Sequence, residues 1–127
     1  MSYTMKNLSE VDDAAVKGGF SEVQEAHFAH GALDATDTGF AYHIVKPGRK
    51  QAFGHRHENA EEVYVVIGGE GRVRLDDVVV ELKRLDALRV EPQVARRFEA
   101  GPDGLEMLVF GARHEGDGEI LPDFWAD

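Results

Sequence analysis

Two histidines and a glutamate near the middle of the chain have the types and the spacing of metal ligands. His55 and His57 are separated by one residue, and Glu62 follows within the stretch GHRHENAEEVYVVIGGEG. Alternate residues of a β-strand share a face, so both imidazoles project to one side, roughly 6.5–7 Å apart along the backbone. If segments 52–57 and 62–67 are antiparallel neighbours, Glu62 faces the same cavity. Two imidazoles and one carboxylate suit divalent Fe, Mn, Ni, Cu or Zn and leave coordination positions open, although an H-x-H pair is also common on solvated surfaces.

The segments that must position these residues are predicted to be β-strands. Short runs rich in β-branched residues alternate with turn residues, and no segment of convincing length has the period of a helix. About nine strands, spaced roughly ten residues apart, indicate an antiparallel sandwich or barrel. The predicted strands cover residues 22–28, 39–45, 52–57, 62–67, 71–75, 78–83, 86–90, 96–100 and 105–112.

The residues between the strands predict where the chain turns. GGEG at 68–71 and DD at 76–77 suit tight hairpins, GPDG at 101–104 suits a type I turn, and KPGRK at 46–50 is another break. The opening 20 residues and the tail GDGEILPDFW lie outside this rhythm, so we expect edge strands or covering arms there. Since no repeat or linker is evident, we predict a single domain over residues 1–127.

The charge of the chain restricts the class of partner. Fourteen Lys and Arg against 24 Asp and Glu give a net charge of −10. This balance argues against nucleic acid and against anionic membrane surfaces, which both require a basic patch. The longest apolar run, 63–67, is too short to cross a bilayer, and no secretion signal is visible. The absence of cysteine excludes disulfides and zinc–thiolate sites. We therefore expect a cytoplasmic protein whose partner is a small molecule.

The histidine-containing stretch resembles the first conserved motif of the cupin superfamily, which is a glycine, H-x-H, a glutamate and a glycine. His55, His57, Glu62 and Gly69 fit this motif, with four residues and then six residues between the last three. The resemblance implies an all-β fold, an antiparallel double-stranded β-helix or jelly-roll barrel with its core at about 39–112. Cupins include dioxygenases, isomerases, epimerases, decarboxylases, storage proteins and regulators, so the fold is implied more specifically than the function.

The second cupin motif departs from the family pattern at its ligand position. In LDALRVEPQVARRFEA, Arg96 stands where the resemblance places a histidine. Arginine has no free lone pair and stays protonated in proteins, so it cannot replace that ligand. If Arg96 points inward, its cation weakens metal binding unless an anion lies between the two.

Three alternatives follow for Arg96. In the first, His55, His57 and Glu62 hold a metal, and Arg96 binds an anionic organic ligand, with oxygenase- or isomerase-type chemistry. In the second, Arg96 pairs with Glu62 in a metal-free cavity that binds an organic ligand, and the histidines remain for acid–base work. In the third, Arg96 only satisfies a buried carboxylate of a scaffold barrel. The sequence leaves open which holds and whether the protein is an enzyme.

Further side chains are expected in the cavity. Tyr64 lies two residues after Glu62 and is expected on the same strand face. Phe98 lies two residues after Arg96 and is likewise expected on its face. Arg96, Tyr64 and Phe98 are therefore predicted to contact the ligand. Tyr64 would serve equally well as an aromatic core residue. His43 could line the cavity as a replacement ligand, although a strand histidine is more often packed or exposed.

Two strands are apolar on both faces, at VYVVI (63–67) and VVV (78–80). A half-exposed strand alternates apolar and polar residues, so we expect the outer face to be covered by the terminal arms or by a second subunit. Small cupins commonly pair sheet to sheet, and the resemblance therefore favours a homodimer. His27 and His30 are predicted to lie on the surface or outside the barrel, and His114 has no partner at ligand spacing.

Overall fold

The strands pair antiparallel throughout the computed structural model, which describes residues 2–112 and 114–127. They are β1 (Gln24–Phe28), β2 (Thr38–Val45), β3 (Gly54–His57), β4 (Glu62–Leu75), β5 (Val78–Lys83), β6 (Ala87–Val90), β7 (Arg96–Ala112) and β8 (Gly118–Leu121). Three short helices, η1 (Leu8–Glu10), α1 (Ala14–Gly18) and α2 (Ala29–Ala32), belong to the N-terminal part. The prediction of an all-β fold is confirmed.

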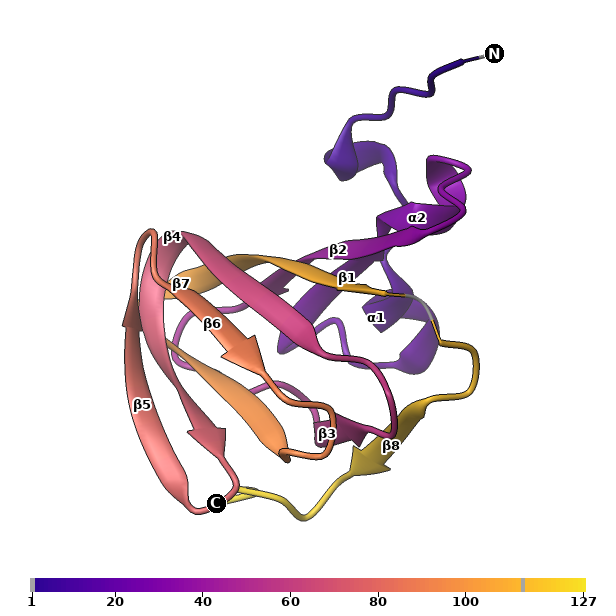
Figure 1. Ribbon diagram of the computed structural model, residues 1–127. Helices are drawn as coiled ribbons and strands as arrows, with labels where there is room; N and C mark the ends of the chain where they lie inside the picture. The colour runs from indigo at the N-terminus through magenta and orange to yellow at the C-terminus, as the bar shows by residue number, and fades with distance from the viewer. Residues whose placement is uncertain (1, 113) are drawn as a thin grey trace.

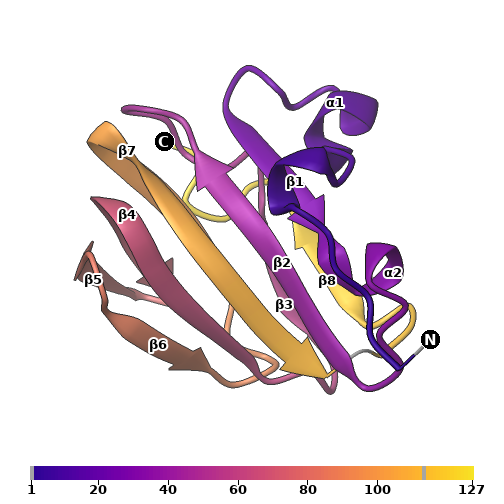
Figure 2. The same ribbon diagram turned by 90° about the horizontal axis from the view of Figure 1, so that it is seen from above.

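One eight-stranded sheet curls into the barrel (Figure 1). The order β1-β2-β7-β3-β8 forms its main path, and β4 pairs with β7 while carrying β5 and β6. The two longest strands, β4 and β7, run side by side and support the other strands (Figure 2). Their curvature turns one face of the sheet inward, and the site described below lies on that face.

The glycine-rich segment at 68–71 is not a hairpin, so that prediction is wrong. The chain continues through it as β4, and segment 101–104 likewise stays within β7, where a type I turn was expected. Gly69 has a φ of 69°, and a Cβ there would lie 1.9 Å from the carbonyl oxygen of Gly104. The glycines therefore permit a close approach of the two strands at a register shift. The hairpin at 76–77 is confirmed, because Leu75 pairs with Val78.

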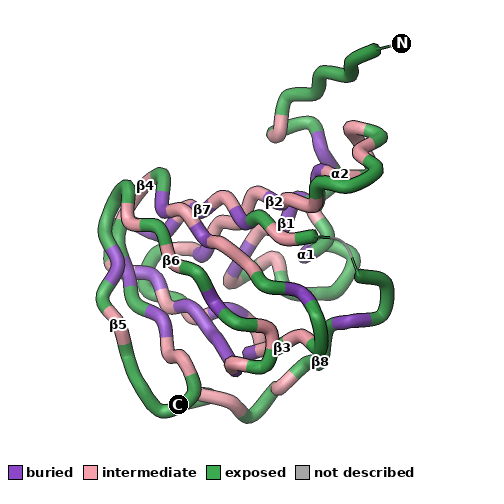
Figure 3. The backbone as a smooth tube through the Cα atoms, in the orientation of Figure 1, coloured by how far each residue is buried: buried purple, intermediate pink, exposed green. Residues whose placement is uncertain are grey.

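The core cluster takes most of its residues from β4 and β7 and the others from β2, β5 and β6. Figure 3 marks the buried positions along these strands in purple. Tyr64 of β4 and Phe98 of β7 meet there with ring centroids 4.7 Å apart. The remaining buried members of this cluster are aliphatic or small: Val45, Val66, Val73, Leu82, Val90, Ala100, Leu105, Met107 and Val109. Alternation along β4 places Tyr64 and Val66 inward, and the register shifts between Val66 and Gly71 move the inward face to odd-numbered positions, so that Val73 is buried as well.

Both ends of the chain lie along edges of the sheet. The N-terminal segment and α1 pack along β1, which lies beside β2 (Figure 2). The C-terminal tail forms β8, which pairs with β3 as an edge strand. Arg97 holds the end of this tail by donating hydrogen bonds to the carbonyl oxygens of Phe124, at 2.9 Å, and of Pro122.

The outer face remains apolar in the single chain. Phe40 of β2 and Phe110 of β7 stack there, with centroids 6.0 Å apart. Phe110 is 38% exposed, and Val78 and Val79 are 56% and 45% exposed. The arms therefore leave these side chains uncovered, and the homodimer stays a prediction. Among the described residues, no helix is long and apolar enough to cross a membrane.

His27 ties the N-terminal arm to β1. Its Nδ1 lies 2.7 Å from the carbonyl oxygen of Val11, its Nε2 lies 2.9 Å from a carboxylate oxygen of Glu25, and its ring stacks on Tyr42. Burial lowers the pKa of His27, but the hydrogen bonds with Glu25 and Val11 outweigh it and leave this pKa above its ordinary value of 6.5. Only the imidazolium can donate from both nitrogens, so the folded protein favours the charged form.

We expect the arm to be anchored more firmly at low pH. Because the folded state raises this pKa, the contribution of His27 is fully present below the unfolded value and is lost as pH rises through the folded value. Replacing His27 by glutamine should lower the free energy of unfolding by about 1 kcal/mol at acidic pH and by less at alkaline pH. Urea unfolding at about pH 5.5 and pH 8.5 measures this difference, with His30→Gln as control. A cost independent of pH would contradict it.

Candidate functional site

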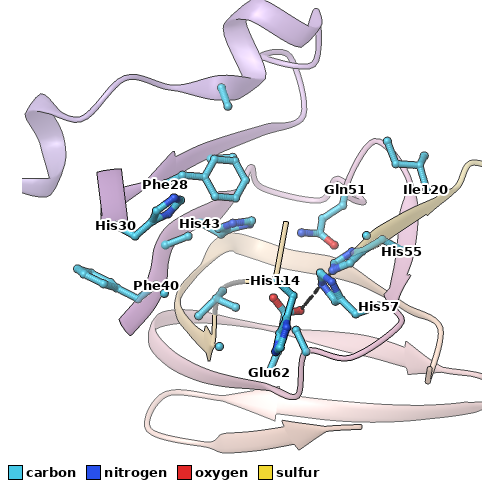
Figure 4. A pocket seen from close by; sticks show the side chains of 18 of the residues that line it. Phe28, His30, Phe40, His43, Gln51, His55, His57, Glu62, His114 and Ile120 are labelled. Atoms are coloured by element: carbon cyan, nitrogen blue, oxygen red, sulfur yellow. Dashed lines mark hydrogen bonds and ion pairs between the residues drawn. The ribbon is translucent and has the colours of Figure 1, made fainter. Parts of the chain in front are cut away.

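His55, His57 and Glu62 come together on the inner face of the barrel. The Nε2 atom of His55 lies 3.4 Å from Oε1 of Glu62, and Nε2 of His57 lies 3.2 Å from the same oxygen. One ligand-type atom from each residue lies within 4.8 Å of the others. The three side chains point toward one another in Figure 4. The predicted convergence of these residues is therefore present in the fold.

The route by which Glu62 reaches the histidines differs from the prediction. Strand β3 pairs with β7 and β8, not with β4, so the expected pairing of 52–57 with 62–67 is wrong. His55 and His57 share a face of β3, and Glu62 is the first residue of β4. The short connection between the two strands brings Glu62 back beneath the imidazoles. The cluster therefore joins two separated strands of the curled sheet.

Glu62 is held as a carboxylate by its neighbours. The Tyr64 hydroxyl donates a hydrogen bond of 2.6 Å to Oε1 of Glu62. Burial raises the pKa of Glu62, but the contacts with His55, His57 and Tyr64 outweigh it and hold this pKa well below its ordinary value. Burial also lowers the pKa of His55, and the nearby Arg96 guanidinium lowers it further, against the effect of Glu62. An ionised carboxylate beside a neutral imidazole is the protonation state in which both bind a metal.

Asp117 supports His57 from behind the cluster, and sequence reasoning missed it. Its Oδ2 lies 3.3 Å from Nδ1 of His57. The Asp117 side chain accepts hydrogen bonds from the backbone N–H of Asn59 at 2.8 Å and of Ala60 at 2.9 Å, and from Nδ2 of Asn59. Burial raises the pKa of Asp117, but these hydrogen bonds leave it lowered overall. The carboxylate is thus held within ion-pair distance of one nitrogen of His57, and the other nitrogen faces the cluster.

Neither ring nitrogen of His57 has a hydrogen-bond partner in the part of the chain that the structure describes, although both are buried. The short contacts to Glu62 and Asp117 meet the distance of a hydrogen bond but not its angles. A buried nitrogen without a partner is costly, and such an atom in a native structure commonly marks an ion or a water. The orphaned Nε2 of His57 is therefore consistent with a metal at the cluster.

The cluster opens into a pocket of about 650 Å³. Phe28, His43, Gln51 and Ile120 lie around it in Figure 4. This volume is in the range of small-molecule sites, and apolar walls with a few polar groups are typical of them. His43 lines this pocket, which was one of the positions considered for it, the other being a packed or exposed strand position. Burial and the proximity of His55 lower the pKa of His43 to about 4.

Two other histidines line the same pocket. His30 of α2 and His114, which follows β7, both contribute to its wall. The expectation that His30 lies outside the barrel is therefore wrong. The short α2 turns the chain after β1 and brings His30 to the mouth of the pocket, and no periodic pattern in the sequence indicated this helix.

Arg96 is fully buried but does not meet the ligand cavity. Its guanidinium donates to the carbonyl oxygens of Glu91 at 3.1 Å and Pro92 at 3.4 Å, and its Nε has no partner among the described residues. Within 2–112 and 114–127 it forms no ion pair with Glu62, so the pairing that the second alternative for Arg96 requires is not present. The carbonyls of the preceding turn are nearer and take its hydrogens.

The three residues predicted to contact a ligand therefore have different positions. Tyr64 lines the pocket, whereas Arg96 and Phe98 are absent from its lining. Phe98 is fully buried in the core, where it packs against Tyr64. Direct contact of Arg96 or Phe98 with a molecule in this pocket is not supported by their positions.

Comparison with known proteins identifies the family of this fold. A protein-family model described as "Cupin domain" matches residues 41–111. A cupin protein from Bacteroides fragilis is 21% identical, with a TM-score of 0.71 over 91% of this chain and 88% of that chain. No curated protein sequence matches.

Two further solved structures carry named activities. A putative sugar phosphate isomerase from Acidithiobacillus ferrooxidans is 20% identical, with a TM-score of 0.67 over 79% of this chain and 66% of that chain. A variant of Streptomyces Pac13 with uridine is 18% identical, with a TM-score of 0.74 over 95% of this chain and 92% of that chain. Pac13 is described as a nucleoside dehydratase. At these identities the similarity establishes the fold alone.

Proposed function

Because this chain belongs to the cupin family, we propose that its barrel holds a divalent first-row metal ion through His55, His57 and Glu62 and binds a small organic molecule beside it. The observation that carries this proposal is the convergence of three ligand-type atoms on one point at the wall of a pocket. The ligand atoms of three residues close in space, together with an adjoining cavity, are what a metal-dependent binding site requires.

The distances from the Glu62 carboxylate to the two histidine nitrogens fit one ion. Metal–nitrogen and metal–oxygen bonds of about 2.0–2.1 Å place neighbouring ligand atoms roughly 3.0–3.4 Å apart in octahedral or tetrahedral geometry. The two distances from Glu62 Oε1 to the histidine nitrogens are 3.2 and 3.4 Å. Three protein ligands leave positions open, at which a bound ion would supply Lewis-acid polarisation of a ligand oxygen.

The residues around the cluster have separate tasks in this proposal. Tyr64 orients the carboxylate of Glu62 through its hydrogen bond, and Asp117 orients the ring of His57. A carboxylate behind a ligating histidine fixes its tautomer and its ring position. Chemistry of the oxygenase or isomerase type is part of the proposal. The named activities of the two neighbours, a nucleoside dehydratase and a putative sugar phosphate isomerase, favour a small organic substrate.

A metal-free acid–base site is the second candidate, and Arg96 favours it. Arg96 lies opposite His55 in the pairing of β3 with β7 and is completely buried. A buried cation without an acidic partner, so near the cluster, opposes a second positive charge. Without metal, His57 with Asp117 behind it would serve as a general base toward a molecule in the pocket.

Metal analysis decides between the two candidates. We expect the untagged protein, purified without chelator, to contain about one first-row divalent ion per chain by mass spectrometry, and to regain it in a calorimetric titration after chelation. A metal-free protein that stays folded and does not take up any of Fe, Mn, Ni, Cu or Zn ions would overturn the metal centre and leave the acid–base candidate.

Replacing Arg96 by histidine is expected to strengthen the centre. Residues directly opposite in an antiparallel pair project to the same face, so an imidazole at 96 would lie beside His55. This change removes a buried cation and adds a ligand, and we expect zinc affinity to rise about tenfold or more. Competition with a chromophoric chelator measures it. Arg96→Met is the matched control, because it removes the charge alone. Equal affinities of the two variants would show that position 96 does not reach the ion.

A further inference from the structure

Two buried glutamines on the pocket wall have amide groups of fixed orientation. Gln24 of β1 and Gln51, which precedes β3, are only 7% and 6% exposed, and both line the pocket. The Oε1 atom of Gln24 accepts a hydrogen bond of 2.7 Å from the backbone N–H of Ala52. The Oε1 atom of Gln51 accepts one of 3.2 Å from the backbone N–H of Phe98. Because a backbone N–H can face only the oxygen of an amide, each Nε2 is placed on the opposite side.

These two Nε2 groups have no acceptor in the protein. Neither donates a hydrogen bond to any residue that the structure describes, whereas the Oε1 atom of each side chain accepts one. Neither atom is sealed in the core, because neither is among the fully enclosed atoms without a partner. The amide of Gln51 extends into the pocket in Figure 4. Buried polar groups are normally hydrogen-bonded, so these donors face the position of a ligand's acceptor atoms.

The walls beside these donors are aromatic. Phe20 and Phe53 meet edge to face with centroids 5.3 Å apart, and Phe28 meets His43 in the same way at 5.6 Å. All four rings line the pocket. Aromatic side chains of this kind contact a planar ring by stacking or by edge-to-face packing.

The charged side chains of the pocket wall, as far as the structure describes it, are acidic and do not favour an anion. Among the described residues, no lysine or arginine lines it, and its formally charged members are Glu62, Glu115 and Glu119. In the metal-free pocket, a carboxylate or phosphate would lose its hydration without gaining a cation from the described side chains. The expectation of an anionic ligand depended on Arg96, which is directed to the carbonyls of Glu91 and Pro92 instead.

We propose that the pocket binds an uncharged planar ring that carries a carbonyl oxygen, as in cyclic or aromatic amides, imides and lactones. The carbonyl accepts from Nε2 of Gln51 and Gln24, and the faces of the ring contact the phenylalanine walls. This inference rests on the proposed function as far as the pocket binds an organic molecule. It does not depend on the metal.

Two fragments of the same shape test the charge and the acceptor. Benzamide is uncharged and has a carbonyl, and benzoate has the same outline with a negative charge. Titrations of the full chain are followed by ligand-observed NMR, both as purified and with chelator present. We expect benzamide to bind at least tenfold more tightly than benzoate in the chelated protein. Equal binding, tighter binding of benzoate, or no binding of benzamide would overturn the proposal.

Variants at the glutamines test the donors. Gln51→Glu and Gln24→Glu retain an oxygen for the backbone N–H and remove the amide hydrogens, so we expect each to weaken benzamide binding about tenfold or more. Gln93→Glu is the matched control, because Gln93 is exposed and remote from the lining. If the Gln51 and Gln24 variants, folded by circular dichroism, bind benzamide as the control does, the assignment of the donors is wrong. Benzamide binding in a protein without metal would leave this inference standing while the metal centre fails.

Discussion

Replacing His55 and His57 together by alanine is expected to abolish metal binding. The change removes two of the three candidate ligands and leaves Glu62 with its hydrogen bond from Tyr64. Four-ligand zinc sites bind with total free energies that correspond to roughly 3 kcal/mol or more per ligand, so the loss of two ligands should lower affinity by a thousandfold or more. Metal content by mass spectrometry and calorimetric titration of the variant measure this loss.

A matched pair of histidines provides the control for this prediction. His30 and His114 line the same pocket but lie outside the cluster. The His30→Ala/His114→Ala variant should therefore retain the metal of the parent protein. Equal loss in both double variants would mean that the ion sits elsewhere in the pocket. Full retention in the His55→Ala/His57→Ala variant would show that this cluster is not the metal site.

Replacing Asp117 by alanine is expected to lower metal affinity by about 10- to 100-fold, which is the usual cost of losing the partner behind a ligating histidine. Asp117 touches no metal in the proposal. It acts through Nδ1 of His57 and through the backbone of Asn59 and Ala60, which it holds in the connection between β3 and β4. Without it, the ring of His57 loses the carboxylate beside it, and the connection that returns Glu62 to the cluster loses three hydrogen bonds.

Two variants separate this positioning role from a general loss of stability. Asp117→Asn retains an oxygen acceptor and should recover part of the affinity, whereas Asp123→Ala removes an exposed acid of the same tail and should have no effect. Chelator competition gives the dissociation constants, and circular dichroism reports the fold. If Asp117→Ala is folded and binds metal as the parent does, the positioning role is disproved.

The ligand set was predictable because it depends on local periodicity. His55 and His57 share a strand face whatever the strand pairs with, and this much follows from alternation alone. The convergence with Glu62 was predicted through the wrong neighbour, since β3 pairs with β7 and β8. Pairing depends on contacts distant in sequence, which one sequence does not reveal. Asp117 could not be found for the same reason, because its partners Asn59 and Ala60 are far away in the chain.

The glycines show where local rules mislead. GGEG and a two-residue DD turn are both hairpin signals, but only the second forms a hairpin. Gly69 instead gives up its side chain so that β4 passes close to the carbonyl of Gly104. A glycine in a sequence shows that the backbone can adopt an unusual conformation there. It does not show whether the fold has a turn or a close approach of two strands at that position.

Arg96 shows a similar limit for buried charge. Its position in the second cupin motif indicated an inward side chain, and it is fully buried. Its partners were not predictable, because they are carbonyl oxygens of Glu91 and Pro92 in the preceding turn. Glu62 was considered as a partner for Arg96 because it carries the opposite charge. Two nitrogens of the Arg96 guanidinium instead donate to backbone carbonyl oxygens nearby.

The candidate metal ligands and part of the pocket wall come from separate stretches of the chain. The ligands all fall within residues 55–62, whereas Phe20 and Phe28 belong to the N-terminal segment and Ile120 belongs to β8. Mutations that remodel the ends of the chain can therefore change which molecule is accepted without altering the atoms that hold the ion. In evolutionary terms, such a barrel can acquire new substrates by drift in its arms while its reactive centre is inherited unchanged.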